Sequence, residues 1–147
     1  MNKIEGAPDK VLTHLTVHVR YPHEVEKVVE FSDIKFIVNQ DIPYYSILAT
    51  SQEAAAEGRL TIRGAGLEAG QEYKISDSSE DVNVSFEVKG ITEYTTDPEG
   101  ILNIAYVGDV EGNVAIQGDF SFEITETIGE KRTLVVRCDV FHIMQNA

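Results

Sequence analysis

The feature that most constrains the fold of this chain is an alternation of apolar and polar side chains that recurs along most of its length. It is clearest where Val82, Val84, Phe86 and Val88 alternate with polar residues. Successive side chains of a β-strand point to opposite faces, so this period predicts strands with one buried and one solvated face. Comparable extended segments are expected at 11–21, 25–31, 34–38, 44–50, 59–63, 72–76, 101–107, 114–124 and 133–144.

Turn residues separate these segments at the spacing typical of sandwiches and barrels. We expect a hairpin connection at 108–113, a turn at 128–131, and at most one short helix near 51–57, where Ser51 would be the cap and Gly58 the stop. No long helix is available to connect parallel strands. The sequence therefore predicts an all-β fold of about ten strands, a mainly antiparallel β-sandwich, and leaves a closed or flattened β-barrel as the alternative.

The length of 147 residues is typical of one domain with one core. Residues 1–10, with Gly6 and Pro8, show no pattern to bury and are expected to form a flexible lead-in. We expect a single β domain over 11–147.

The charge balance narrows the classes of partner. Twelve basic residues against 25 acidic ones give a formal charge of −13, which repels nucleic-acid phosphates and anionic lipids. The single cysteine, Cys138, excludes a disulfide within the chain, and the sequence shows neither a signal core nor a membrane span. We expect a soluble, cytoplasmic protein that binds neither nucleic acid nor membranes.

The strongest candidates for a ligand site are His14, His18 and Arg20, which share the polar side of the segment 11–21. At strand spacing the two histidines lie too far apart to share one metal ion. They are expected to be solvated on a sheet. Only if the sheet closed into a barrel with this side inward would the three residues line a cavity.

Two other constellations lack the pattern of a reactive centre. Cys138 and His142 are four residues apart and on the same alternation of the last strand, a spacing that favours a buried thiol and a packed histidine over a catalytic pair. Both sides of this strand are partly apolar, which indicates a central strand or one with a bulge. Acidic turns such as Asp77–Asp81 have no recognisable calcium-loop spacing. We therefore predict no catalytic residues, no metal site and no cofactor.

The part of the chain from Gly100 onward, with the segment Gly118–Phe122 and the closing Val140–Ile143, resembles small bacterial β-sandwich proteins that carry a Gly-x-Phe-x-Phe strand. The turn Gly108–Gly112 is similar to one in allene-oxide-cyclase-like and dirigent-like barrels. These resemblances imply a β fold and supply no catalytic residue.

Two functional hypotheses follow. The absence of a catalytic constellation favours a non-catalytic binding or interaction module whose acidic surface meets a basic protein, or a second copy of the chain through edge strands. The alternative is a small barrel that binds an apolar small molecule, with isomerase or cyclase activity, using His14, His18 and Arg20. An antitoxin-like neutraliser of a basic protein is a third possibility, based on charge alone.

Overall fold

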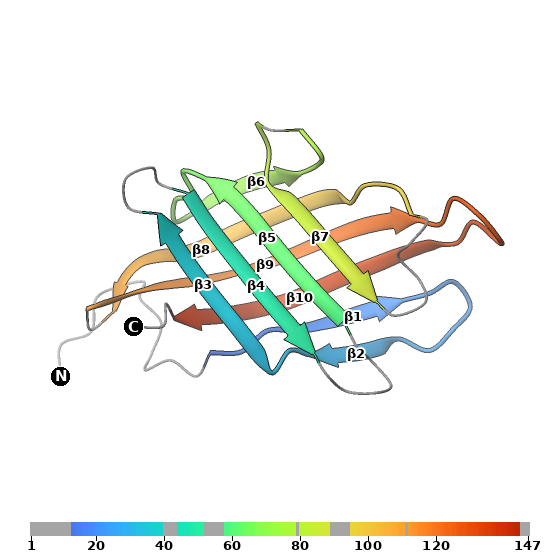
Figure 1. The fold of residues 1–147 in the computed structure, drawn as a ribbon, viewed down its shortest axis with the longest axis horizontal. Coiled ribbons are helices and arrows are strands. Elements are labelled where there is room, and N and C mark those ends of the chain that lie inside the picture. The colour runs from blue at the N-terminus through green and yellow to red at the C-terminus, as the bar shows by residue number, and fades with distance from the viewer. Residues whose placement is uncertain are drawn as a thin grey trace.

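The chain folds into two antiparallel sheets packed face to face (Figure 1). The computed structural model describes residues 13–39, 44–51, 58–78, 80–88, 95–110 and 112–144. All regular structure in these ranges is extended. The ten strands are β1 (Thr16–Arg20), β2 (Lys27–Glu30), β3 (Asp33–Asn39), β4 (Tyr44–Ser51), β5 (Gly58–Ala65), β6 (Gln71–Ile75), β7 (Asn83–Val88), β8 (Glu99–Val110), β9 (Asn113–Thr125) and β10 (Thr133–Met144).

The six-stranded sheet has the order β2-β1-β10-β9-β8-β6, and the four-stranded sheet has the order β3-β4-β5-β7. In Figure 1 the four-stranded sheet lies in front, and its strands cross those of the sheet behind obliquely. Within the described part of the chain the strand order of each sheet has two separate ends, so neither sheet closes on itself. The sandwich prediction is confirmed, and the closed-barrel alternative does not apply.

The core lies between the sheets and is built by the predicted alternation. Leu15, Val17 and Val19 face inward from β1, and Leu134, Val136 and Cys138 do so from β10. The rings of Phe86 on β7 and Phe122 on β9 meet edge to face, with centroids 6.0 Å apart, and so join the two sheets at the centre. Burial of these apolar faces is the main force that holds the sheets together.

Strand boundaries differ from the prediction at a few points. β1 begins at Thr16, and His14 forms only an isolated bridge with His142. β2 is restricted to Lys27–Glu30, and Val25 is 87% exposed, because the chain turns tightly at His23 before it becomes extended. The predicted helix near 51–57 falls largely on residues 52–57, which lie outside the described ranges, while Ser51 ends β4.

The predicted turns are found where β8, β9 and β10 meet. Val110 pairs with Asn113 across a two-residue hairpin whose Gly112 has a φ of 89°, a conformation that favours glycine. Gly100 lies within β8, opposite Phe122. A side chain there would collide with the backbone of β9, so close strand packing explains this glycine.

Two irregularities bend the long strands of the six-stranded sheet. The β8–β9 register shifts between Ile104 and Tyr106, and the β9–β10 register shifts between Cys138 and Phe141. The second shift confirms that the last strand carries a bulge. It also corrects one expectation: Cys138 and His142 do not share a face, because the extra residue places Phe141 and Ile143 in the core and His142 on the outside.

Candidate interaction surface

The polar side of β1 faces outward. His14 and Arg20 are exposed, and 25% of the His18 side-chain surface is accessible. The residues between them, Leu15, Val17 and Val19, fill the core, so the three polar side chains line no internal cavity. This outward orientation lacks the inward polar face on which the barrel hypothesis depends.

His18 belongs to a ring of four ionisable side chains on the outer face, with Glu26, Arg137 and Asp139. Its Nδ1 lies 3.1 Å from Glu26 Oε1, a distance close enough for an ion pair but without hydrogen-bond geometry. Its Nε2 lies 3.9 Å from Asp139 Oδ2. Arg137 donates from Nε to Asp139 Oδ1 at 2.7 Å and from Nη1 to Glu26 Oε2 at 3.1 Å. Each carboxylate therefore bridges the arginine and the histidine.

The ring connects the turn before β2 to the bulged part of β10. The hydrogen bond from Arg137 holds the pKa of Asp139 below its ordinary value, and the same bond, followed by the one to Glu26, raises the pKa of the guanidinium. Arg137 therefore already has two carboxylate partners within the ring. The ring is a structural contact between these two segments, and it lies at one border of a larger groove.

The groove runs over the outer face of β6, β8, β9 and β10, and its volume is about 360 Å³. Asn103 Nδ2 donates to Asp119 Oδ1 at 2.9 Å within it. Three carboxylates line it against one guanidinium, that of Arg137. The lining residues are Glu72, Ile101, Asn103, Asp119, Phe120, Ser121, Arg137, Cys138 and Asp139.

Strand pairing brings these residues together from distant parts of the sequence. Glu72 on β6 lies opposite Asn103 on β8, which lies opposite Asp119 on β9. Arg137 on β10 lies opposite Ser121 on β9. The individual strands could be found from the sequence, but the groove could not, because alternation says which side chains share a face and not which strands are neighbours.

Cys138 lies beneath this surface. Burial raises the pKa of its thiol to about 12, which leaves it protonated and unreactive at neutral pH. His142 lies on the outer side, where its ring stacks on that of His14 with centroids 5.1 Å apart. Burial and the neighbouring His14 lower the pKa of His142. The two residues point to opposite sides of β10 and form no nucleophile–base pair.

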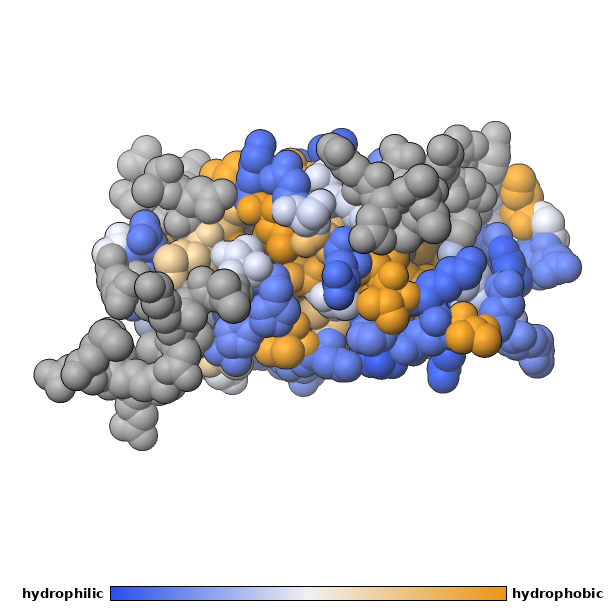
Figure 2. Space-filling view, turned by 90° about the horizontal axis from the view of Figure 1, so that it is seen from below, coloured by the Kyte–Doolittle hydropathy of each residue, from blue (hydrophilic) through white to orange (hydrophobic). Residues whose placement is uncertain are grey.

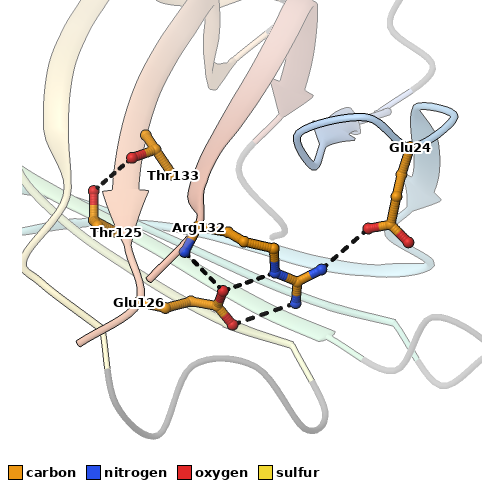
Figure 3. A network of polar contacts seen from close by, with 5 residues as sticks. All are labelled: Glu24, Thr125, Glu126, Arg132 and Thr133. Atoms are coloured by element: carbon orange, nitrogen blue, oxygen red, sulfur yellow. Dashed lines mark hydrogen bonds and ion pairs between the residues drawn. The ribbon is translucent and has the colours of Figure 1, made fainter. Parts of the chain in front are cut away.

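A second polar cluster, centred on Arg132, connects two turns at one end of the molecule (Figure 3). Arg132 donates to both carboxylate oxygens of Glu126, at 2.8 and 3.3 Å, and to Glu24 at 3.2 Å. Its guanidinium also lies 5.2 Å from the centre of the buried Tyr21 ring. Burial raises the pKa of Tyr21. The guanidinium thus joins Glu126 and Glu24, so the cluster links the turn before β10 to the turn after β1.

The remaining candidates are also satisfied locally. Asp81 accepts a hydrogen bond from Ser76 at 2.7 Å, and Asn83 donates to the carbonyls of Ser76 and Ser78. A small hollow of about 100 Å³ beside this loop is lined by two cations, Arg63 and Lys74, and by the carboxylates of Glu80 and Asp81. Its charges balance, so it selects neither a cation nor an anion.

Within the described ranges, no three His, Cys, Asp or Glu side chains are placed to hold a metal ion. The same residues contain no helix with the length and hydropathy needed to cross a membrane. No protein-family model matches this sequence. No curated protein and no solved structure is significantly similar to it.

Proposed function

We propose that this protein is a non-catalytic binding module that holds a basic segment of a partner protein in the groove on the outer face of the six-stranded sheet. The observation that carries the proposal is the location of the groove: its three carboxylates lie on strands of the six-stranded sheet, over the buried apolar core. Rigid strands position side chains with little loss of conformational freedom on binding.

The described part of the interior offers little polar chemistry to orient a small molecule. Twenty-eight described apolar side chains are buried, and only Ser51 and Thr61 are buried polar residues in the same ranges. Sites for small molecules combine apolar walls with a few placed polar groups. The function is therefore sought on the surface.

The groove has the chemistry of a site for lysine or arginine side chains. Asp119 keeps its second oxygen after the bond from Asn103, and Glu72 and Asp139 add negative charge on either side. Ile101 is 43% exposed and offers an apolar contact for the methylene stem of a long cationic side chain. A basic extended segment is thus complementary to the groove in both charge and contact area.

The surrounding face supports the same partner class. Its charged residues include seven carboxylates and three cations: Glu26, Glu30, Glu72, Glu99, Asp119, Glu123 and Asp139, with Arg20, Lys74 and Arg137. Glu99 and Glu123 lie directly opposite each other on β8 and β9, an arrangement of like charges that destabilises the free sheet. A cationic partner would relieve this repulsion as well as that within the groove.

The test is binding of a fluorescent hexalysine peptide, followed by anisotropy at low and high salt. We expect saturable binding that weakens with salt, and a loss of at least about tenfold in affinity in the Asp119→Asn, Glu72→Gln double variant. The matched control is Asp33→Asn, Glu87→Gln, which removes the same two charges from the outer face of the four-stranded sheet. A hexaglutamate peptide should not bind.

If the control pair lowers the affinity for hexalysine equally, the peptide responds only to the net charge of the protein. That result would contradict binding in the groove. Absence of hexalysine binding at low salt would contradict the proposed function itself. Thermal unfolding of each variant shows whether a change in affinity reflects a change in folding.

A further inference from the structure

We propose that His14 and His142 form a two-histidine site for a divalent transition-metal ion of the copper, nickel and zinc group. The site lies on the outer face of the six-stranded sheet, where the chain that leads into β1 runs beside the end of β10 (Figure 1). Imidazole nitrogen is a preferred ligand of these ions. Neither histidine lines the groove, so the site is independent of the proposed binding of a basic segment.

The backbone holds the two histidines directly opposite each other. The N–H of His14 donates to the carbonyl of His142 at 2.7 Å, and the N–H of His142 donates to the carbonyl of His14 at 3.1 Å. Residues paired in this way across antiparallel segments project their side chains from the same face. The adjacent residues Leu15 and Ile143 are buried in the core and anchor both segments. The Cα positions of the two ligands are therefore set before an ion binds.

The separation of the two rings suits one shared ion. Their centroids are 5.1 Å apart. With nitrogen–metal bonds of about 2.0–2.1 Å and each ring centre about 1.1 Å behind its nitrogen, two imidazoles at about 90–110° around one metal have centroids roughly 4.4–5.2 Å apart. The ring planes differ by 29°, and the broad χ2 preference of histidine lets each ring turn a nitrogen toward the ion.

The surroundings of the pair allow an ion to enter and to complete its coordination. His14 is exposed and His142 is partly exposed, so both rings can be reached from solvent. Gln117 on β9 lies opposite His142, and its amide oxygen or water molecules can fill the remaining positions around the metal. The formal charge of −13 attracts cations to the protein as a whole.

The other histidines of the described ranges are less suited to this role. In Figure 2, where the molecule is seen from below, apolar side chains gather between hydrophilic margins, so ligand atoms for a cation are sought on the polar outer faces. There His18 already contacts the carboxylates of Glu26 and Asp139, which Arg137 shares. His23 lies in an exposed turn. Sequence spacing could not reveal the site, because its two ligands lie near opposite ends of the chain.

The experiment is calorimetric titration of the full chain, without an affinity tag, with Cu²⁺, Ni²⁺ and Zn²⁺ at neutral pH. We expect one Cu²⁺ per chain with a Kd below about 100 µM, and weaker binding of the other two ions, in keeping with their intrinsic order of affinity. His14→Gln and His142→Gln should each weaken Cu²⁺ binding at least about tenfold, because a single imidazole cannot chelate the ion. His23→Asn, which removes an exposed imidazole elsewhere, is the matched control and should bind Cu²⁺ like the wild type.

A second measurement requires no variant and so does not depend on how the variants fold. In a nuclear magnetic resonance titration of the wild type with Zn²⁺, the ring signals of His14 and His142 should shift together and saturate at one equivalent. The ring signals of His18 and His23 should stay in place. Mg²⁺, which prefers oxygen ligands, should shift none of the four rings.

Three results would overturn the proposal. The first is a Kd for Cu²⁺ above about 100 µM in the wild type. The second is an equal loss of affinity in His23→Asn and in the variants of the pair, with all three folded by circular dichroism. The third is a Zn²⁺ titration that shifts only one ring of the pair. Hexalysine binding is expected to be unchanged in His14→Gln, so failure of this site and failure of the groove are distinguishable.

Discussion

The two sheets of this sandwich have similar inner faces and opposite outer ones. Both turn apolar side chains inward, and Phe86 and Phe122 meet between them. Outside, the six-stranded sheet is acidic, bulged and crossed by ion pairs, whereas the four-stranded sheet keeps an unshifted register and carries more cations than carboxylates. Folding requires both inner faces to be apolar, because they pack against each other. It sets no such requirement on the outer faces, whose charges can therefore differ.

The largest expected effect is on the free energy of unfolding and concerns a side chain of the inner face. Phe122→Ala should lower the free energy of unfolding by about 3–5 kcal/mol, because it removes a buried ring and leaves a cavity between the sheets. Ile37→Ala, on the outer face of the four-stranded sheet, should change it by less than about 0.5 kcal/mol. Urea unfolding measures both. Similar losses in the two variants would contradict the division between inner and outer faces.

A second pair of variants compares one glycine in each sheet by how close neighbouring atoms lie to its Cα. A methyl group at Gly118, beside the β8–β9 bulge, would collide with the carbonyl of Asn103 and lie 3.0 Å from the Phe141 ring. At Gly64, in the four-stranded sheet, it would meet only side chains, with Val82 Cγ2 at 3.1 Å. Gly118→Ala should therefore cost roughly 1–3 kcal/mol, and Gly64→Ala less, in the same urea assay. The reverse order would show that β8–β9 packing is looser than described.

A third prediction concerns the ion pairs that fasten the six-stranded sheet. The hydrogen bonds from Arg132 lower the pKa of Glu126, so this carboxylate stabilises the folded state above its unfolded pKa, about 4.3, and the stabilisation is lost as the pH falls through the lowered folded value. Glu126→Gln should reduce Tm at pH 7, and its difference from the wild type should shrink as the pH falls below about 4.3. Glu123→Gln, an exposed neighbour without this network, should not reproduce the pH dependence. A Tm difference for Glu126→Gln that stays constant with pH would contradict the role of its charge.

The smallest expected effect contrasts two cross-strand pairs. Glu99→Gln should stabilise the fold by about 0.2–1 kcal/mol, because it removes a repulsion with Glu123 on the facing strand. Glu87→Gln should destabilise it by about the same 0.2–1 kcal/mol, because Glu87 lies opposite Arg59. Thermal unfolding at low salt measures both variants. A change in stability of the same sign in the two variants would contradict the electrostatic difference between the outer faces.

Much of the fold could be predicted from the sequence because burial imposes a local pattern. The alternation of Val82, Val84 and Phe86 identified β7, and the turn at 108–113 identified the β8–β9 hairpin. The assignment of Cys138 and His142 to one face failed, because a register shift of one residue leaves no clear mark in a segment where nearly every other side chain is apolar.

The sequence by itself determined most of the strands and which side chains share a face, as His18 and Arg20 do, since these depend on the two-residue period of an extended chain. The tertiary structure decided that this shared face is turned outward. Only the tertiary structure decided which strands are neighbours, and hence that Glu72, Asn103 and Asp119 form one groove and that β3 is an edge. The physical reason is that strand pairing joins residues that are far apart in the sequence. The alternation within one strand does not specify which other strand pairs with it.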